Sequence, residues 1–501
     1  MSERGPRLRE LELKLLAAGP LDPRDLATNG LALGVEERGS RTLTATYHDT
    51  EDLRLARWGA TLRYRTGEGR SGRWTLKLPD AGLGSRTELD FRGSPQKVPD
   101  EVHRLVVALV RSAPLKPAAK LRTRRRTWAL TDSEGEVAEL VDDDVSVLEG
   151  RVVAARFREV EIEARSATLA QLEEIARALK KGGAVPGDQI PKAVRAFGPR
   201  AQAPPDVPVS DPVRPGDPAA GAVRAVLLDG TRRVMRHHAG VVLGDAESVH
   251  QMRVGARRLR SDLRTFSSLV DEAWARAVTV NLAWLAGVLG EVRDLDVLGE
   301  RLRGHATRAA DLAPMFDRLD DRREACRDEL LRALVSDRYV ALLDGLVVSA
   351  DDPPVTPPAG APCRKVLAPL VAAAWSPLGK AGRLLDESDA EEDWHRVRKK
   401  AKRARYAAEA AARCLGPAAK EARRFAAECE SVQEVLGEHQ DAVVARDTVT
   451  AMAKEIEAPP AFHFAAGRLA ETEDRAARAA RSAFPGVWER LDRKKRRKWF
   501  S

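Results

Sequence analysis

The stretch ELELK at residues 10–14 alternates charged and apolar side chains, and EVEIE at residues 159–163 does the same. Successive side chains of a β-strand point to opposite faces of a sheet, so each stretch predicts a strand with one charged and one apolar face. Carboxylates and one lysine share the first face, while Leu, Val and Ile share the second. These two segments therefore predict a sheet that packs on one side and gathers charge on the other.

The same texture runs from the start of the chain to about residue 197. Short alternating segments such as RTLTATYHDT (41–50), ATLRYRT (60–66) and RWTLKLP (73–79) are separated by Gly, Pro, Asp and Ser, which is typical of strands and turns. Two stretches, 100–112 and 168–183, have helical spacing instead. Residues 1–200 are therefore predicted to form an α+β domain dominated by antiparallel sheet.

The second half of the chain has a different pattern and repeats itself. A Pro-rich linker at 201–219 leads into long Ala, Leu, Arg and Glu runs, which predict an all-α bundle over 220–490. HQMRVGARRLR (250–260) is answered by HRVRKKAKRAR (395–405), and VLGEVRD (288–294) by VLGEHQD (435–441). Two helical halves related by a pseudo-twofold axis follow from this repeat. Residues 491–501 form a basic tail, suited to indiscriminate polyanion binding or to a disordered solubilising role.

The bulk composition indicates an anionic partner. The 501-residue chain has a formal net charge of +9, which attracts polyanions, but aromatic residues make up only 5% and leave few platforms for base stacking. The start has no apolar stretch of signal-peptide length, and no later segment is expected to span a membrane. We therefore expect a cytoplasmic protein without a membrane partner. Its four cysteines lack metal-binding spacing and are expected to be buried thiols.

Charges of both signs occupy the strand pattern of the first half. If the strands close into a barrel, these charges point inward, where an unpaired charge is costly. Triphosphate with bound Mg²⁺ or Mn²⁺ meets this requirement, because Lys and Arg hold phosphate oxygens and hard carboxylate oxygens hold the cation. A sheet with a solvated charged face is the alternative.

ELELK resembles the ExExK signature of the CYTH, or triphosphate tunnel metalloenzyme, superfamily, and YHDT, LRYR, WTLK, KLR and EVEIE follow in the family's usual order. The resemblance implies an eight-stranded antiparallel, tunnel-like barrel that acts on triphosphate, thiamine triphosphate or RNA 5′-triphosphates, or cyclises ATP. It implies that the metal ligands are Glu10, Glu12, Glu159 and Glu161, with Glu163 or Glu88 as further ligands. It implies that the phosphate-binding, catalytic residues are Lys14, Arg63, Arg65, Lys77, Lys120 and Arg122.

Two further family positions are less regular in this chain. Asp142 and Asp144, in VDDDV, lie on a strand that often supplies an acidic residue, and their register stays open. The segment IPKAVR (190–195) resembles the family's terminal block, but Pro191 stands where the family has serine, which leaves the role of Lys192 open.

The two repeated histidine motifs of the second half each place a row of cations on one helix face, because residues three and four apart share a face. A solvated basic face explains one such helix, but duplication of the histidine and of the spacing favours a binding site. The pattern resembles the CHAD domain, which is associated with polyphosphate binding. The resemblance implies a central basic groove formed by His250, Arg253, Arg257, Arg260, His395, Arg398, Lys402 and Arg405, with Arg232, Arg233 and Arg236 of the preceding helix as further candidates.

Together these features predict a metal-dependent inorganic triphosphatase with a polyphosphate-binding helical domain. A non-catalytic polyphosphate-binding or localisation protein is one alternative. A tunnel enzyme acting on thiamine triphosphate or a nucleotide is another. Nucleic-acid binding is disfavoured, because it leaves the inward carboxylates unexplained and the aromatic residues are sparse.

Overall fold

The computed structural model describes residues 11–20, 22–23, 31, 33–69, 71–79, 86–187 and 190–500. The chain divides into two compact units, Met1–Asp206 and Val207–Ser501. The first is built around an antiparallel sheet and the second is all-helical, as the two sequence patterns predicted.

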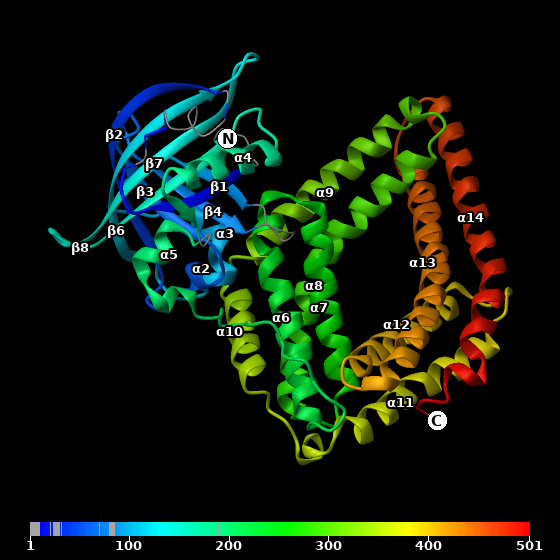
Figure 1. The fold of residues 1–501 in the computed structure, drawn as a ribbon. Helices are drawn as coiled ribbons and strands as arrows, with labels where there is room; N and C mark the ends of the chain where they lie inside the picture. The colour runs from blue at the N-terminus through cyan, green and yellow to red at the C-terminus, as the bar shows by residue number, and fades with distance from the viewer. Residues whose placement is uncertain are drawn as a thin grey trace. The chain divides into compact units, whose positions relative to one another are not determined.

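The sheet of the first unit has nine strands in the order β5-β4-β3-β2-β6-β7-β8-β1-β9 (Figure 1). The expected eight-stranded closed barrel is therefore wrong in strand number and in closure. Among the described residues, no ladder joins the edge strands β5 and β9. β9 has only three residues and ends at Pro186, which has no N–H to donate to a further strand. The strands are β1 (Glu12–Ala17), β2 (Gly34–Asp49), β3 (Thr61–Thr66), β4 (Arg73–Pro79), β5 (Arg86–Phe91), β6 (Lys116–Thr131), β7 (Glu136–Glu149), β8 (Val152–Ala164) and β9 (Ala184–Pro186).

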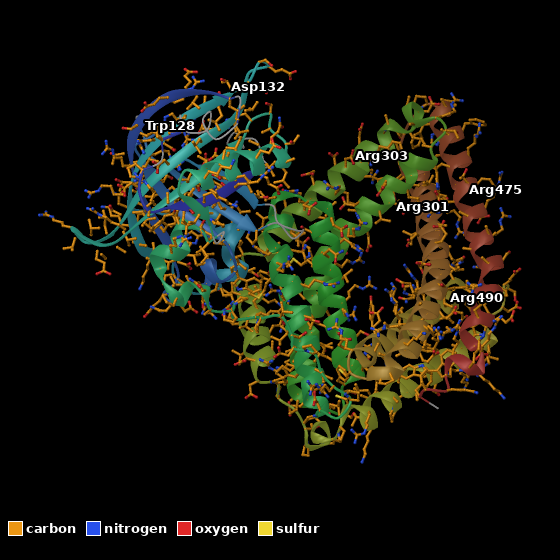
Figure 2. The ribbon with its side chains drawn as sticks, in the orientation of Figure 1. Trp128, Asp132, Arg301, Arg303, Arg475 and Arg490 are labelled. Carbon is orange, nitrogen blue, oxygen red and sulfur yellow. The ribbon has the colours of Figure 1, made fainter. Side chains whose placement is uncertain are left out.

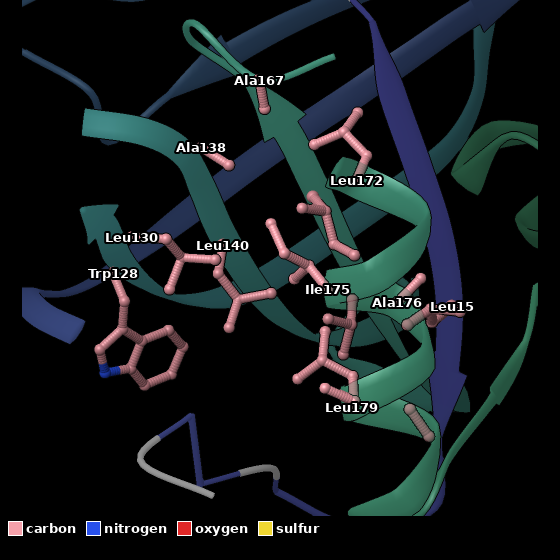
Figure 3. Close-up of a cluster of buried hydrophobic side chains, with 14 of the residues drawn as sticks. Leu15, Trp128, Leu130, Ala138, Leu140, Ala167, Leu172, Ile175, Ala176 and Leu179 are labelled. Atoms are coloured by element: carbon pink, nitrogen blue, oxygen red, sulfur yellow. The ribbon is translucent and has the colours of Figure 1, made fainter. Parts of the chain in front are cut away.

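One face of the sheet packs against helix α4 (Leu169–Lys181). The apolar partners of the alternating strands, among them Leu15, Leu140 and Ile162, form a core with Leu172 and Ile175 of the helix (Figure 3). The helix begins in a capping box, in which Thr168 and Gln171 satisfy each other's backbone N–H groups. Helix and sheet thus fix which face of each strand is buried in the core, and the charged residues of β1 and β8 are left on the opposite face.

That opposite face is covered at one end by the short helix α5 (Lys192–Phe197). Ala193 lies in a small apolar core with Ala45, Tyr47 and Val145, and Phe197 packs edge-on against Tyr47 at a ring-centroid distance of 6.3 Å. The described part of the unit also contains the helices α2 (Arg54–Arg57) and α3 (Asp100–Val110). Because α5 is anchored by this core, its first residue, Lys192, is carried to the charged part of the sheet.

The helical unit repeats one packing pattern twice. In each half, consecutive helices pack side by side: α6 on α7, α7 on α8 and α8 on α9, then α11 on α12, α12 on α13 and α13 on α14 (Figure 1). α7 also contacts α12, which joins the two halves at the helices that carry the histidine motifs. The helices are α6 (Ala219–Leu243), α7 (Ala246–Thr265), α8 (Glu272–His305), α9 (Ala313–Ala333), α10 (Asp337–Asp351), α11 (Cys363–Leu384), α12 (Glu391–Ala412), α13 (Ala419–Glu455) and α14 (Pro460–Asp492).

The two halves are also joined by an apolar core and an ion-pair network. Side chains of α8, α9, α13 and α14, including Leu302 and Phe462, form one buried cluster. Beside it the Arg301 guanidinium (Figure 2) donates to Glu473 at 2.6 Å and to Glu438 at 2.7 Å. Glu473 is fully buried, so Arg301 supplies the charge that a buried carboxylate requires.

Helix α8 is long and apolar enough, by length and composition, to cross a membrane, contrary to the expectation that no segment approaches a span. It is the one such helix among the described residues. Its buried positions, which include Leu285 and Leu289, belong to the helical unit, where α8 packs against α7, α9 and α10. A helix within a bundle passes the same test of length and composition.

The basic tail folds back onto the second half of the helical unit rather than extending as a disordered segment. Arg496 donates to Glu428 at 2.7 Å, and Phe500 is 8% exposed and packs edge-on against Phe425. Apolar contacts as well as charge therefore hold the end of the chain.

Candidate functional site

Strand register gathers the charged residues of the first unit on one face of the sheet. Residues directly opposite each other in adjacent strands point to the same side. Lys14 of β1 lies opposite Glu161 of β8, and Glu12 lies opposite Glu163. Farther along, Glu159 of β8 lies opposite Asp143 of β7, which in turn lies opposite Arg125 of β6. The face that points away from the α4 core therefore carries carboxylates and cations from four adjacent strands.

Three of the predicted metal ligands form a compact carboxylate cluster. Glu12, Glu161 and Glu163 each offer an oxygen, and these oxygens lie within 4.8 Å of one another. Glu159, beside this cluster, is 1% exposed, and its Oε2 atom faces Lys192. Hard oxygen donors at this spacing fit Mg²⁺ or Mn²⁺. Glu10, a further predicted ligand, lies outside the described residues.

Three cations are interleaved with these carboxylates. Lys192 Nζ lies 2.5 Å from Asp143, 3.2 Å from Glu159 and 3.1 Å from Glu161. Arg125 makes two hydrogen bonds to Asp143, at 2.9 and 2.7 Å, and Lys14 lies 3.0 Å from Glu161. Each carboxylate of this buried set therefore has a cationic partner, which offsets the cost of its desolvation.

These contacts shift the pKa values of the buried carboxyl groups in different directions. Burial would raise the pKa of Glu161, but Lys192, Lys14 and Arg125 hold it well below its ordinary value. Burial likewise opposes ionisation of Asp143, yet Lys192 and Arg125 lower its pKa. For Glu159 burial prevails and raises the pKa. Glu159 is thus the carboxylate of this set that takes up a proton most readily.

A basic group from β3 and β4 lies on the same face of the sheet. Arg63 of β3 lies opposite Tyr47 of β2, and Arg65 lies opposite Ala45. Lys77 of β4 lies opposite Thr61 of β3. Burial, followed by the nearby Arg63, lowers the pKa of Arg65 to about 10. Arg125 contributes repulsion to both arginines as well as attraction to Asp143, so the basic group and the carboxylates border one space.

Glu88 of β5 belongs with the basic group and not with the carboxylate cluster. It forms an ion pair with Lys77 and lies 3.8 Å from Arg63. Glu88 is not part of the group formed by Glu12, Glu161 and Glu163, and its expected role as a metal ligand stays a prediction.

Lys120 and Arg122 point away from this face, contrary to expectation. In β6 the residues that share the face of Arg125 are the odd-numbered ones, and Leu121 and Thr123 are accordingly buried. Lys120 and Arg122 are exposed on the outer side. A one-residue change of register moves every side chain of a strand to the other face, and the run KLRTRRR offers cations at both parities.

Sequence reasoning missed Arg125 and Asp143 and left Lys192 open. The sequence feature that could have identified Asp143 is its position between Asp142 and Asp144 in VDDDV. Alternate residues of a strand face opposite sides, so Asp143 faces the side that its two neighbours do not. Asp142 is used on the outer side, where it pairs with Arg126 and Arg158. Lys192 reaches the carboxylates although Pro191 precedes it, because Pro191 serves as the N-cap residue of α5.

In the helical unit the repeated motifs place two arginines in equivalent surroundings. Arg253 of α7 pairs with Asp294 of α8 at 2.8 Å, and Arg398 of α12 lies 3.9 Å from Asp441 of α13. Each guanidinium lies against a glycine of the neighbouring helix, Gly290 or Gly437. A Cβ added there would lie 3.5 Å and 3.3 Å, respectively, from the nearest guanidinium atom. Both aspartates are therefore partners of the motif arginines.

Arg253 and Arg398 are close to Arg257 and Lys402, and we call these four residues the helical cation cluster. Burial, and then repulsion from Arg257, Arg398 and Arg253, lowers the pKa of Lys402 to about 7. Burial and the proximity of Arg253 also lower the pKa of Arg257. Such mutual repulsion is relieved when a polyanion binds.

Of the other predicted residues of the two motifs, the two histidines border this cluster, because Arg253 is among the charges near His250 and Arg398 and Lys402 are among those near His395. His395 shares a hydrogen bond of 2.8 Å with Gln440, and burial with Arg293 nearby lowers the pKa of His250. Arg405 is paired with Glu409 and Glu430 at 2.7 and 2.6 Å. The charged neighbour that most affects Arg260 is Arg264, beyond the end of the cluster.

Comparison with known proteins identifies both domains. Residues 8–194 match the CYTH domain model and residues 225–450 match the CHAD domain model. The chain is 32% identical over 498 residues to the uncharacterized proteins Rv2226 and MT2285 of Mycobacterium tuberculosis, and each match covers 92% of this chain and 91% of the relative. The chain belongs to the CYTH–CHAD proteins.

Solved structures similar to this CYTH–CHAD chain cover one part of it each. PptA from Streptomyces chartreusis is 26% identical with a TM-score of 0.47, covering 55% of this chain and 100% of that one. The CHAD domain from the plant Ricinus communis is also 26% identical with a TM-score of 0.47, covering 56% and 94%. The PH1819 protein of Pyrococcus horikoshii is 16% identical with a TM-score of 0.25, covering 38% and 99%. CYTH domains include triphosphatases and adenylyl cyclase-like enzymes, and CHAD domains are associated with polyphosphate binding.

Proposed function

We propose that the CYTH unit hydrolyses inorganic triphosphate with the help of Mg²⁺ or Mn²⁺, and that the CHAD unit binds inorganic polyphosphate. The observation that carries the first part is the arrangement of one sheet face. Carboxylates of β1, β7 and β8 border the same space as cations of β3, β4 and β6. A substrate that carries several negative charges and a divalent cation satisfies both groups at once.

The two sides of the face have different tasks. Glu12, Glu161 and Glu163 would hold the cation, since their oxygens already lie within 4.8 Å of one another. A bound divalent cation would offset charge on the phosphoryl oxygens and lower the pKa of the attacking water. Arg63 and Arg65 would bind phosphate oxygens through charge-assisted hydrogen bonds, and both guanidinium groups are charged at neutral pH.

Glu159 is the residue proposed to accept the proton of the attacking water. A general base works best when its pKa approaches the working pH, and burial raises the pKa of Glu159 toward that range. Lys192, 3.2 Å away, would position the carboxylate and limit how far its pKa rises.

The decisive experiment for the CYTH unit is phosphate release from triphosphate with Mg²⁺ and Mn²⁺. We expect Glu12→Gln/Glu161→Gln to lower turnover at least 100-fold, because two oxygen ligands lose their charge. The matched control is Glu149→Gln, which changes an exposed glutamate at the end of β7 and should retain wild-type turnover. ATP and thiamine triphosphate, assayed alongside, identify a different preferred substrate.

One observation favours a second candidate function, non-catalytic polyphosphate binding. Lys14, Arg125 and Lys192 already pair with Glu161, a carboxylate that a metal would use. If no tested triphosphate compound is hydrolysed with either metal, while the protein binds polyphosphate tightly, the CYTH unit is not a triphosphatase and the second candidate stands.

Polyphosphate binding by the CHAD unit is proposed to depend on the helical cation cluster. We expect Arg253→Met/Arg398→Met to weaken binding of long-chain polyphosphate at least tenfold, and wild-type affinity to fall as salt rises. Arg423→Met is the matched control, since Arg423 is an exposed arginine of α13 outside the cluster. Equal losses in the double variant and the control would contradict this assignment.

A further inference from the structure

A basic cavity lies in the CHAD unit, lined by residues of α6, of α7 and of the end of α12. Its volume is about 260 Å³, and the charged residues around it include Asp229, Arg233, His237, Arg258, Asp262 and Arg413. This is smaller than the roughly 300–1,000 Å³ of pockets that hold drug-sized ligands. The cavity therefore suits a compact ion better than an extended chain.

The cavity is separate from the helical cation cluster. An α-helix turns by about 100° per residue. The α7 residues that line the cavity, which include Gly255, Arg258 and Asp262, are centred about 150° around the helix from the stripe that contains Arg253 and Arg257. An anion held here does not occupy the position of one held by that cluster.

The positive charge at this cavity is only partly neutralised by the protein. Arg258 pairs with Glu409 at 2.8 Å, and Arg413 pairs with Asp229. Arg233 forms no ion pair with any residue in the described part of the chain. Burial, and then repulsion from Arg258 and Arg413, lowers the pKa of Arg233. Converging guanidinium groups of this kind attract an oxyanion.

Buried polar atoms at the cavity also lack partners within the described residues. Asp262 is 2% exposed and its Oδ1 atom has no hydrogen-bond partner, while its Oδ2 atom lies 3.9 Å from Arg258. The Nδ1 atom of His237 is buried and unpartnered as well. Native proteins pair most buried polar atoms, so two unpartnered atoms in one basic cavity favour a polar ligand there. Burial raises the pKa of Asp262 to about 7, which allows its protonated form to donate a hydrogen bond to an oxyanion near neutral pH.

We propose that this cavity binds a single small phosphate-type oxyanion, with Arg233 and Arg258 as the principal cationic ligands and Asp262 as a hydrogen-bond donor. The ion is either free orthophosphate or pyrophosphate, or the terminal phosphate of a polyphosphate chain whose remainder lies outside the cavity. This site is independent of catalysis in the CYTH unit, so loss of triphosphatase activity does not bear on it.

The test is isothermal titration calorimetry of the full chain with orthophosphate, pyrophosphate and sulfate. Arg233→Met keeps most of the side-chain stem, and it should weaken binding at least tenfold, the effect of losing one charge-assisted hydrogen bond. The matched control Arg423→Met, at an exposed position of α13, should change it less than twofold. Binding of the small ions identifies a free ion as the ligand, whereas an Arg233-dependent component seen only with long-chain polyphosphate identifies a chain end. Binding that Arg233→Met leaves unchanged with every probe overturns the proposal.

A pH series with sulfate tests Asp262 separately, because the charge of sulfate is constant between pH 6 and 8. The charged groups facing Asp262 are Arg258 on its own helix, Asp229 of α6, and Glu409 and Arg413 of the α12 region. Wild-type affinity should rise as pH falls through 7 and the carboxylate becomes neutral. Asp262→Asn should bind sulfate throughout this range with a weaker pH dependence. The same pH dependence in wild type and variant overturns the role of Asp262 and assigns the titration to another group, such as His237.

Discussion

Two arginines three residues apart on β6 provide a sharp test of the strand register. Arg125 is held by two hydrogen bonds to Asp143, whose side chain is 1% exposed, whereas Arg122 is exposed on the opposite face. Removing one partner of a buried ion pair costs about 3–5 kcal/mol. Lys192 Nζ remains 2.5 Å from Asp143 in the variant, so Asp143 keeps one cation. We therefore expect Arg125→Met to cost about 3 kcal/mol, the lower end of that range.

The same substitution at Arg122 should change stability by less than about 0.5 kcal/mol, as is usual for exposed positions. For a unit of about 200 residues, 3 kcal/mol corresponds to a decrease in melting temperature of about 6–12 °C. Calorimetry of the full chain measures the shift, and hydrogen exchange of β6–β8 peptides assigns the transition to the CYTH unit. A larger loss in Arg122→Met than in Arg125→Met would refute the register, because it would mean that Arg122 faces the carboxylates.

Three further outcomes are expected. Polyphosphate binding should be accompanied by uptake of a proton near pH 8, because the pKa of Lys402 is about 7 in the free protein and a bound polyanion raises it. Calorimetric titration in buffers of different ionisation enthalpy detects this uptake, and Lys402→Arg should remove it. Because the folded protein lowers the pKa of Glu161, this group stabilises the fold fully above its unfolded pKa, and that stabilisation is lost as the pH falls through the lower folded pKa. Lys192→Met should therefore move acid unfolding of the CYTH unit to higher pH in a circular-dichroism titration. Glu161→Gln should weaken Mn²⁺ binding, seen by electron paramagnetic resonance, without altering polyphosphate affinity.

Much of the fold could be predicted from local pattern. Alternation in ELELK and EVEIE predicted the two-faced strands, because burial of one sheet face selects apolar residues at every second position. The duplicated HxxR motifs predicted the internal repeat, and their arginines lie in equivalent surroundings against Gly290 and Gly437. The number of strands and the absence of closure were not predictable in this way, because they depend on which edges find partners.

The sequence by itself therefore determined the two units, the strand faces of β1 and β8, and the residue types that make a phosphate and metal site. Only the tertiary structure decided which cations of the run KLRTRRR face the carboxylates, and it selected Arg125 over Lys120 and Arg122. It also brought Lys192 to Glu159 and Glu161 across some 30 residues of chain. The physical reason is that a run of arginines places cations on both faces of a strand, so the pattern does not show which set faces the carboxylates. Only the hydrogen-bond register with β2 and β7 fixes the choice.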